Sequence, residues 1–322
     1  MSLAVIIVSY NVRDLLRACL RATYDSLAAS PELQAEVMVV DNASTDASAE
    51  MVAAEFPQAR LTVSSKNLGF AGGNNLALRA LGFADGRDAR PDFVLLLNPD
   101  AEPQGEALAR MVDFLKRNPH AGGVGPRLSY PDGRFQHSAF AFPGLTQLWF
   151  DFFKPRPRRL LESRWNGRYP LSLYDADEPF PVDFVLGAAL MTRRETIDAV
   201  GLMDEGYFMY AEEVDWCWRM QRAGWPFYCA PAAHVIHHGG ASAGQFRARS
   251  FVNLWRSRKR LYERFYTPAQ LAIAGGIVRL GMGAEASSAH RAARRGEIGE
   301  VELMQRLAAT REVADLFGKR QS

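Results

Sequence analysis

A short apolar run that stops on turn-forming residues and a carboxylate constrains this chain most. The run covers residues 93–97, with Pro91 and Asp92 before it and Asn98, Pro99 and Asp100 after it. It is too short for a helix and lacks polar alternation, so it predicts a strand that is buried on both faces. Strands of this kind belong to open parallel sheets, where ligands bind beyond the carboxyl ends of the strands. Asp100 is therefore expected at a binding site.

Alternating strand and helix patterns place this run in an α/β domain. Strand patterns occur at residues 3–9, 36–40, 61–64 and 93–97. Helical patterns occur at about 12–27 and at 51–56, and the glycine-rich stretch 69–75 opens another helix. This alternation predicts a mostly parallel, Rossmann-like central sheet with helices on both faces. Ser44, Thr45 and Asp46 are expected to cap the second helix.

The second half of the chain is less regular. Short strands are expected near residues 122–126, 182–192, 227–230 and 235–237, and a helix is expected over 212–223. Beyond about residue 242 the pattern becomes helical and basic, so we expect one domain at residues 1–245 and a helical C-terminal extension at 246–322. The basic, proline-containing stretch 154–168 is either a solvated loop or a flap over a binding site.

Composition limits the class of protein. The 322 residues are 48% hydrophobic, which is enough for a sizeable core, and the formal charge of +2 argues against wholesale nucleic-acid binding. Cys19, Cys217 and Cys229 are odd in number and lack metal-site spacing, which indicates reduced thiols in a cytoplasmic protein. The apolar start lacks the basic region and cleavage site of a secretory signal, and no apolar run reaches the ~18 residues of a membrane span.

Polar side chains follow each predicted strand of the first half. The clusters are Ser9-Tyr10-Asn11, residues 41–46, residues 67–75 and Asn98-Pro99-Asp100. Because the carboxyl ends of parallel strands share one edge of a sheet, these clusters should converge, although each alone could be a helix cap or a turn. Asp41 directly follows its strand, where its carboxylate could accept a hydrogen bond from a pyrimidine imide N–H or a ribose hydroxyl.

The glycines of the third cluster do not form a dinucleotide fingerprint. Gly69, Gly72 and Gly73 have the wrong spacing for that motif, and no acidic residue follows a later strand at the required distance. The glycines more plausibly permit close approach of the backbone to a ligand.

Asp100 has two interpretations. If it faces phosphates, its carboxylate would bind a divalent cation, and Asn98 would add only a neutral oxygen, so metal affinity should be low before the phosphates arrive. Alternatively, Asp100 caps the next helix, with Pro103 in its first turn. His237 ends a short strand and offers a ring nitrogen that suits manganese-like ions.

A second acidic set opens a helix and consists of Glu212, Glu213 and Asp215. One glutamate can point into a cleft while the other caps the helix. Asp215 and Arg219 are four residues apart and are expected to form an ion pair. The helix dipole alone also favours acids in a first turn, but it does not explain the aromatic residues at 207, 208 and 210.

Together these motifs resemble family 2 glycosyltransferases of the GT-A fold, and within them a rhamnosyltransferase-like branch. The resemblance covers about residues 3–245 and rests on the order of motifs at residues 8–11, 41–46, 67–75, 95–100, 187–188, 201–205, 207–210, 212–215 and 237–242. Two positions depart from the family pattern. The family usually has Asp where Glu213 stands, and its Asn-x-Gly is Asn75-Leu76-Ala77 here.

The resemblance implies a site for a nucleoside-diphosphate sugar. The donor-binding residues would be Ser9, Tyr10, Asp41, Asn67, Gly72, Asn75, Asn98 and Asp100. Asp41 would recognise the uracil or thymine ring, and Asp100 and His237 would bind a divalent metal ion, Mg²⁺ or Mn²⁺. Glu213 would be the catalytic base, with Glu212 and Asp215 in the same acidic set.

The implied activity is inverting transfer of a hexose, in first place rhamnose from dTDP-rhamnose, to a hydroxyl of a saccharide or lipid-linked saccharide in cell-envelope polysaccharide synthesis. One alternative is a catalytically inactive nucleotide-sugar-binding or scaffold protein. Another is a sugar nucleotidyltransferase, which should carry a glycine-rich basic loop after the first strand, unlike Ser9-Tyr10-Asn11-Val12.

The location and partners of the chain depend on the extension. A cytoplasmic enzyme without a nucleic-acid partner is expected. Aromatic residues interleave with basic ones at residues 247–266, a composition that suits the anionic inner face of the cell membrane. An ordinary helical extension would instead pack on the first domain or form a homodimer.

Overall fold

The computed structural model describes residues 2–86, 89–239 and 247–318, and it divides into two compact units. The first unit contains Met1–Phe142, Tyr169–Phe208 and Glu212–Ser242, and the second contains Pro143–Arg168, Met209–Ala211 and Ala243–Ser322. Residues 143–168 thus group with the C-terminal helices. The boundary predicted between residues 245 and 246 lies outside the described residues.

The first unit follows the alternating order that the sequence predicts. Its elements are β1 Ser2–Ser9, α1 Arg13–Ala28, β2 Gln34–Asp41, α2 Ser48–Glu55, β3 Arg60–Val63, α3 Gly69–Ala80, β4 Phe93–Leu97, β5 Ala101–Pro103, α4 Ala107–Arg117, β6 Gly123–Ser129, β7 Phe135–Gln136, β8 Ala139–Phe140, α6 Leu171–Asp175, β9 Phe180–Val182, β10 Phe184–Val185, β11 Ala189–Arg193, α7 Arg194–Val200, α8 Glu212–Arg222 and β12 Phe227–His237. The second unit contains α5 Leu145–Phe152, the 3₁₀ turns Arg158–Glu162 and Arg164–Asn166, α9 Arg247–Phe265, α10 Pro268–Arg294 and α11 Glu300–Leu316.

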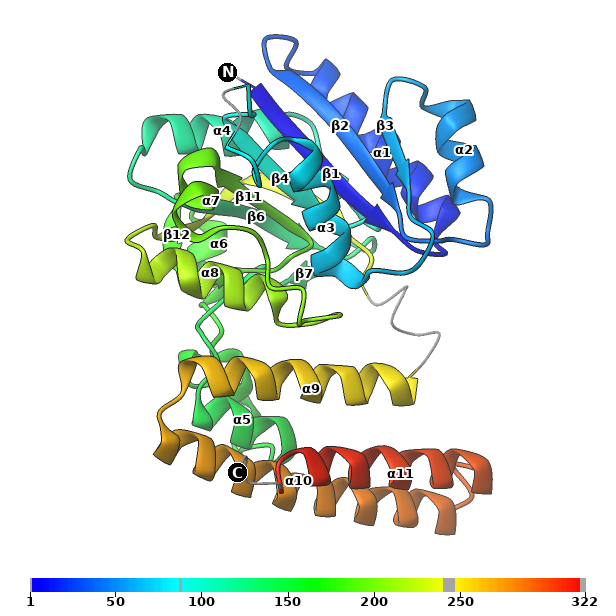
Figure 1. Ribbon diagram of the computed structural model, residues 1–322. Coiled ribbons are helices and arrows are strands. Elements are labelled where there is room, and N and C mark those ends of the chain that lie inside the picture. The colour runs from blue at the N-terminus through cyan, green and yellow to red at the C-terminus, as the bar shows by residue number, and fades with distance from the viewer. Residues whose placement is uncertain (1, 87–88, 240–246, 319–322) are drawn as a thin grey trace. The chain divides into compact units, whose positions relative to one another are not determined.

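A single large sheet organises the first unit (Figure 1). Its main strand order is β3-β2-β1-β4-β11-β6-β12-β5. The strands from β3 to β4 are parallel to one another, β11 runs antiparallel to both of its neighbours, and β12 is parallel to β6. The predicted α/β architecture, with a mostly parallel central sheet, is confirmed.

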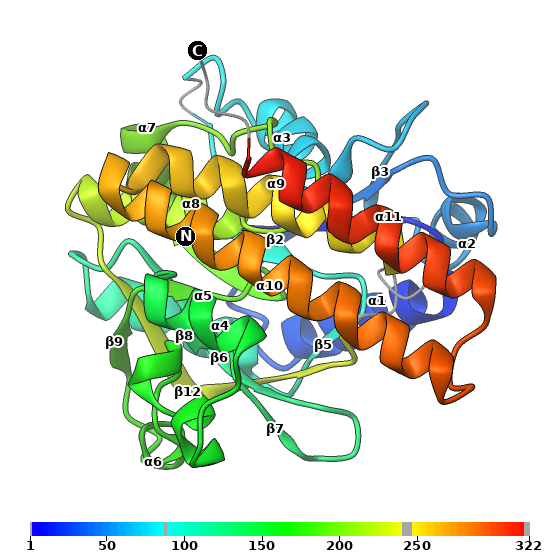
Figure 2. The ribbon, with the colours of Figure 1, turned by 90° about the horizontal axis from the view of Figure 1, so that it is seen from below.

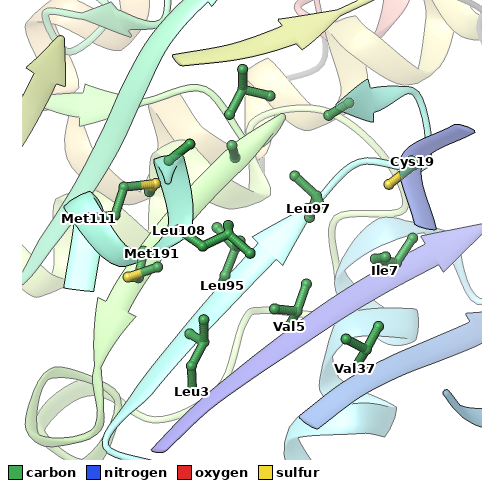
Figure 3. Close-up of a cluster of buried hydrophobic side chains, with 14 of the residues drawn as sticks. Leu3, Val5, Ile7, Cys19, Val37, Leu95, Leu97, Leu108, Met111 and Met191 are labelled. Carbon is green, nitrogen blue, oxygen red and sulfur yellow. The ribbon is translucent and has the colours of Figure 1, made fainter. Parts of the chain in front are cut away.

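Helices cover both faces of this sheet, which explains why residues 93–97 are apolar without alternation. Leu3, Val5 and Ile7 of β1 point to one face, where they join a core with apolar residues of α1, α2 and α4 (Figure 3). On the other face α3 packs so closely that a Cβ added to Gly73 would lie 2.6 Å from Val8 Cγ1. Every residue of β4 is buried as a result.

The segment after β4 overturns one interpretation of Asp100. Residues 101–103 form β5, which pairs antiparallel with β12 so that Ala101 lies opposite His237. The next helix begins only at Ala107. The interpretation of Asp100 as a helix cap with Pro103 in the first turn is therefore wrong, because the residues after Asp100 form a strand. Residues 227–237 form one strand, and its register shift between Ala230 and His234 explains the interrupted strand pattern.

The second unit is a helical assembly around Trp255. In Figure 2, α10 and α11 run side by side, and α5 also packs on α10. The Trp255 ring is 2% exposed, stacks on Phe152 at 5.1 Å and meets the edge of Phe317 at 6.2 Å. Arg258 lies over the same ring and pairs with Asp151 at 2.6 Å. No described helix combines the length and the apolar character that a membrane span requires.

Two glycines of α10 allow a matched test of this packing. A Cβ at Gly281 would lie 2.3 Å from the Phe152 ring, whereas no described atom comes within 4 Å of a Cβ at Gly283. We expect Gly281→Ala to lower the free energy of unfolding by about 1–3 kcal/mol, because it overpacks the α5–α10 contact. Gly283→Ala should raise it by about 0.5–1 kcal/mol, because glycine is a poor helix former. Denaturant unfolding followed by circular dichroism measures both, and equal effects would contradict this packing.

Candidate active site

The loops that follow β1 and β2 are joined to each other at the carboxyl edge of the sheet. Ser9 lies opposite Asp41 in the strand register. The Asn11 backbone N–H donates to Ser44 Oγ at 3.1 Å, and Asn11 Oδ1 accepts from the Thr45 N–H at 2.7 Å. The Thr45 hydroxyl also donates to Asn11 Oδ1, at 3.3 Å. The side chains of Ser44 and Thr45 thus contact the loop after β1, and the expectation that they cap the second helix is wrong.

Asp41 is the last residue of β2, and its two carboxylate oxygens differ in their hydrogen bonds. Its side chain is almost fully buried, and Oδ2 accepts from the Ser44 N–H at 2.9 Å. Among the described residues, neither Asp41 Oδ1 nor the buried Ser9 Oγ has a hydrogen-bond partner. An unsatisfied buried polar atom is costly, so a ligand that donates to Asp41 Oδ1 would gain binding energy there. Tyr10 follows Ser9 directly and is half-buried.

The amide of Asn42 shapes the glycine-rich segment. Asn42 Nδ2 donates to the Gly69 carbonyl at 2.9 Å, and Oδ1 accepts from the Leu68 N–H at 3.1 Å. Asn67 Oδ1 accepts from the Gly69 N–H at 2.9 Å. Gly69 has φ +73°, and a Cβ there would lie 2.0 Å from the Phe208 carbonyl oxygen, so no larger residue fits. Sequence reasoning did not single out Asn42, although it follows Asp41 directly.

Two predicted donor-site residues of this segment are engaged in packing. Asn75 is 1% exposed; its Nδ2 donates to the Met203 carbonyl at 2.8 Å and to Glu205 at 2.9 Å, and its Oδ1 accepts from the Met203 N–H at 3.0 Å. A Cβ at Gly72 would lie 2.9 Å from Leu68 Cβ. Asn75 thus holds the 203–205 segment against α3, and direct donor binding by Asn75 and Gly72 stays a prediction.

Asp100 and His237 meet where β5 pairs with β12. Asp100 Oδ1 lies 3.3 Å from His237 Nε2, and Asp100 Oδ2 accepts from the Gly239 N–H at 3.1 Å. Asn98 Nδ2 lies 3.4 Å from the same ring nitrogen. Burial alone would raise the pKa of Asp100, but the hydrogen bond and charge of His237 and the Gly239 N–H hold that pKa below its ordinary value. The carboxylate is thus kept ionised.

The acidic helix start contains groups with different environments. Glu213 packs against Gly187, where an added Cβ would lie 3.6 Å from both Cβ and Cγ of Glu213. Burial raises the pKa of Glu213, and backbone N–H groups oppose this only in part. Glu212 is buried. Asp215 is fully buried and accepts from Arg219 Nε at 2.8 Å and from the Tyr207 hydroxyl at 3.4 Å, so the predicted Asp215–Arg219 ion pair is confirmed.

The backbone before this helix is strained. Tyr210 and Ala211 have φ values of +73° and +65°, which side-chain-bearing residues rarely adopt. Strain of this kind concentrates at functional sites, where the surrounding structure must hold it.

A chain of contacts connects the glutamates with the strand-end cluster. Gly187 lies against Glu213, and the next residue, Ala188, accepts a hydrogen bond from the Asn98 N–H at 2.9 Å. A Cβ added to Gly187 would also lie 3.5 Å from the Phe70 ring in the glycine-rich segment. The acidic helix, the strand-end cluster and the glycine-rich segment are thus linked through contacts of residues 187 and 188.

The matching family model is that of glycosyl transferase family 2, and it covers residues 4–201. The chain therefore belongs to glycosyltransferase family 2. A curated relative of this glycosyltransferase, the N-acetylglucosaminyl-diphospho-decaprenol L-rhamnosyltransferase of Mycobacterium tuberculosis, is 32% identical over 68% of this chain and 72% of its own length. Rhamnosyltransferase WbbL of Escherichia coli is 26% identical over 59% of this chain and 68% of its own.

Solved structures show that the glycosyltransferase has the GT-A fold. The mannosyltransferase PcManGT from Pyrobaculum calidifontis, solved with GDP-Man and Mn²⁺, has a TM-score of 0.52 at 19% identity and covers 99% of this chain and 88% of its own. GalNAc-T7, solved with UDP, GalNAc and Mn²⁺, has a TM-score of 0.52 at 14% identity over 74% of this chain and 44% of its own. The resemblance seen in the sequence is confirmed at the level of family and fold.

The amide of Asn42 gives a testable prediction. Asn42→Asp would place an anionic oxygen against the Gly69 carbonyl, so we expect a loss of about 1–3 kcal/mol in the free energy of unfolding and weaker binding of nucleoside diphosphates. Asn118→Asp is a matched control, because Asn118 Nδ2 also donates to a carbonyl, that of Phe114 at 2.9 Å, but at the end of α4. Calorimetric titration with dTDP and UDP should show a loss for Asn42→Asp alone. Equal nucleotide affinity in the two variants would contradict the role of Asn42.

Proposed function

We propose that this protein transfers a sugar, with inversion, from a nucleoside-diphosphate donor to a hydroxyl of a saccharide or lipid-linked saccharide acceptor. The observation that supports it best is the contact chain from Glu213 through Gly187 and Ala188 to Asn98, which brings a carboxylate with a raised pKa beside the strand-end cluster. A base and a phosphate-binding cluster in one place are what a single displacement needs.

Residues of the sheet edge would hold the donor. Asp41 Oδ1 would accept the imide N–H of a uracil or thymine ring, since it is buried without a partner among the described residues. Ser9 and Tyr10 adjoin it, and Asn67 and Gly69 keep the backbone of the glycine-rich segment close to the ligand. The N-terminus of α3 would face the diphosphate, where its partial positive charge is favourable.

The donor set of Asp100 and His237 suits a divalent ion of the type bound by the fold relatives. Asp100 Oδ1 and His237 Nε2 converge within 3.3 Å, and carboxylate with imidazole is a ligand pair that Mn²⁺ accepts. The described residues contain no group of three or more His, Cys, Asp or Glu side chains that could hold an ion. The phosphates would therefore complete the ligand set. A bound ion would neutralise charge on the departing diphosphate.

Glu213 would take the proton of the acceptor hydroxyl as that oxygen attacks the anomeric carbon. The carbon–oxygen bond to the diphosphate breaks on the opposite side, which inverts the configuration. Glu212 adjoins this base. Asp215 would position it indirectly, because Asp215 orients Arg219 of the same helix, and Arg219 donates to the Val200 and Leu202 carbonyls. The side chain of Glu213 is one methylene longer than the aspartate that is usual in the family.

Rhamnose from dTDP-rhamnose is the proposed donor sugar, and a lipid-linked saccharide of cell-envelope polysaccharide synthesis is the proposed acceptor. Both rest on the names of the relatives, one of which includes decaprenol. The proposed location is the cytoplasm, at the inner face of the membrane.

Charge distribution supports contact of the second unit with an anionic lipid surface. This unit holds 21 Lys and Arg against 9 Asp and Glu, a formal charge of +12, while the first unit has 17 against 27, a charge of −10. Trp149 and Trp165 are 43% and 65% exposed. One face of α10 exposes Ala269, Ala272, Ile273, Leu280, Gly283 and Ala284, with the exposed Arg279 beside them. Basic charge, exposed tryptophan and an apolar helix face are the features of interfacial binding, whereas like charge disfavours a second copy.

The base assignment predicts a separation of binding from turnover. Glu213→Gln should bind the donor nucleotide with unchanged affinity but lose transfer by at least about 100-fold, because general-base catalysis contributes roughly 10²–10⁴-fold. Glu213→Asp should retain part of the activity. Because the raised pKa keeps Glu213 protonated at low pH, kcat/KM should increase with pH through a pKa above the ordinary glutamate value. Product formation from dTDP-rhamnose measures this.

The two alternatives predict other results in the same assay. A scaffold protein would bind the nucleotide and never form product, in the unsubstituted protein as in the variant. A sugar nucleotidyltransferase would instead release pyrophosphate from a nucleoside triphosphate. Near-normal turnover of Glu213→Gln would contradict only the assignment of Glu213 as the base.

The lipid contact is tested by flotation of the full chain with vesicles. We expect binding to vesicles that contain phosphatidylglycerol, weakened by salt, and little binding to pure phosphatidylcholine. Ile273→Asp with Leu280→Asp should reduce binding at least tenfold, because burial of each side chain contributes about 1.5–3 kcal/mol. Val63→Asp, at a 60% exposed residue of the first unit, is the control. Equal binding to neutral vesicles, or a dimer in light scattering that the double variant abolishes, would contradict the lipid proposal.

A further inference from the structure

We infer that Gln136 is a positioning residue that sets which nitrogen of His237 faces Asp100. The inference rests on the proposed function, because it concerns the pair proposed to hold the divalent ion. His237 Nδ1 lies 3.1 Å from Gln136 Oε1, on the side of the ring opposite the nitrogen that faces Asp100. Gln136 was not among the residues expected from the sequence.

The backbone delivers Gln136 to this place by strand pairing. Gln136 lies in β7, opposite Leu128 of β6, and Leu128 in turn lies beside Val235 of β12. The hairpin between β6 and β7 closes with the Tyr130 N–H donating to the Arg134 carbonyl at 2.8 Å. Gln136 and His237 are thus held on neighbouring parts of one sheet.

A carbonyl oxygen can only accept a hydrogen bond, so Gln136 Oε1 requires the proton on His237 Nδ1. The neutral imidazole carries one N–H, and Nε2 then presents a lone pair. Asn98 Nδ2, a donor, lies 3.4 Å from His237 Nε2 on the other side of the ring.

His237 Nε2 and the Asp100 carboxylate oxygen are 3.3 Å apart, so a proton on Nε2 or a metal ion must lie between them. A metal ion needs the lone pair of Nε2, and therefore a ring that carries its N–H on Nδ1. Without an acceptor at Nδ1, the ring would instead place its proton on Nε2 and donate it to Asp100, which removes the ligand nitrogen. Gln136 therefore keeps His237 ready to bind a metal ion, as partners outside the ligand set do in metalloproteins.

The test is Gln136→Met, which keeps the length of the side chain but removes the acceptor. We expect the affinity for Mn²⁺ in the presence of dTDP, measured by electron paramagnetic resonance, to fall about 10–100-fold. The ¹⁵N shifts of His237 in metal-free protein should lose the Nδ1–H signature and retain that of Nε2–H. Gln136→Glu should restore both, since a carboxylate also accepts from Nδ1–H.

Two further variants separate the possible failures. Gln104→Met is a matched control, because Gln104 Nε2 donates to the Glu102 carbonyl at 2.9 Å and the same change there should leave Mn²⁺ affinity unaltered. Asp100→Ala should abolish Mn²⁺ binding. If Asp100→Ala has no effect, the proposed metal site itself is wrong. If Asp100→Ala weakens binding while Gln136→Met changes neither affinity nor ¹⁵N shifts, the inference about Gln136 is overturned and the metal site stands.

Discussion

The parallel register of β1, β2 and β4 is the constraint on which the rest of the structure depends. Ser9 pairs with Asp41, and Ile7 pairs with Leu97, so all three strands end at one edge. β1 from Leu3, β2 from Val37 and all of β4 are buried and apolar up to the strand ends, because helices cover both faces. Polar residues can therefore gather only where the strands stop, and ligand chemistry is concentrated there.

Side-chain amides then organise the loops that leave this edge. Asn42 holds the glycine-rich segment through two hydrogen bonds, and Asn75 holds the 203–205 segment through three. An amide carries both donors and acceptors and no charge, so it can satisfy buried backbone groups without adding to the negative field of nearby carboxylates. The loops are thus fixed before any ligand binds, which lowers the ordering cost of binding.

The sheet and its strand-end clusters could be predicted because they rest on local patterns. The run at residues 93–97 and the acidic start of α8 are each visible within a few residues. The partners of Asn75 and His237 could not be predicted, since Met203 and Gln136 lie 128 and 101 positions away and meet them only after the sheet forms. Likewise, residues 143–168 were expected as part of the first domain, but their aromatic residues pack on α9 and α10, as the Phe152 contacts with Trp255 and Gly281 show.

Asp100 and Glu213 of the first unit show how the same chemical group acquires opposite tendencies. Asp100 gains His237 and the Gly239 N–H because β5 pairs with the end of β12, and these partners outweigh burial and lower its pKa. For Glu213, backbone N–H groups do not compensate for burial, so its pKa is raised. Carboxylates whose pKa values are pushed apart in one site take different roles. A permanently ionised Asp100 suits cation binding, whereas Glu213 binds a proton more readily and suits proton transfer. This difference follows from strand pairing in one case and from helix packing in the other.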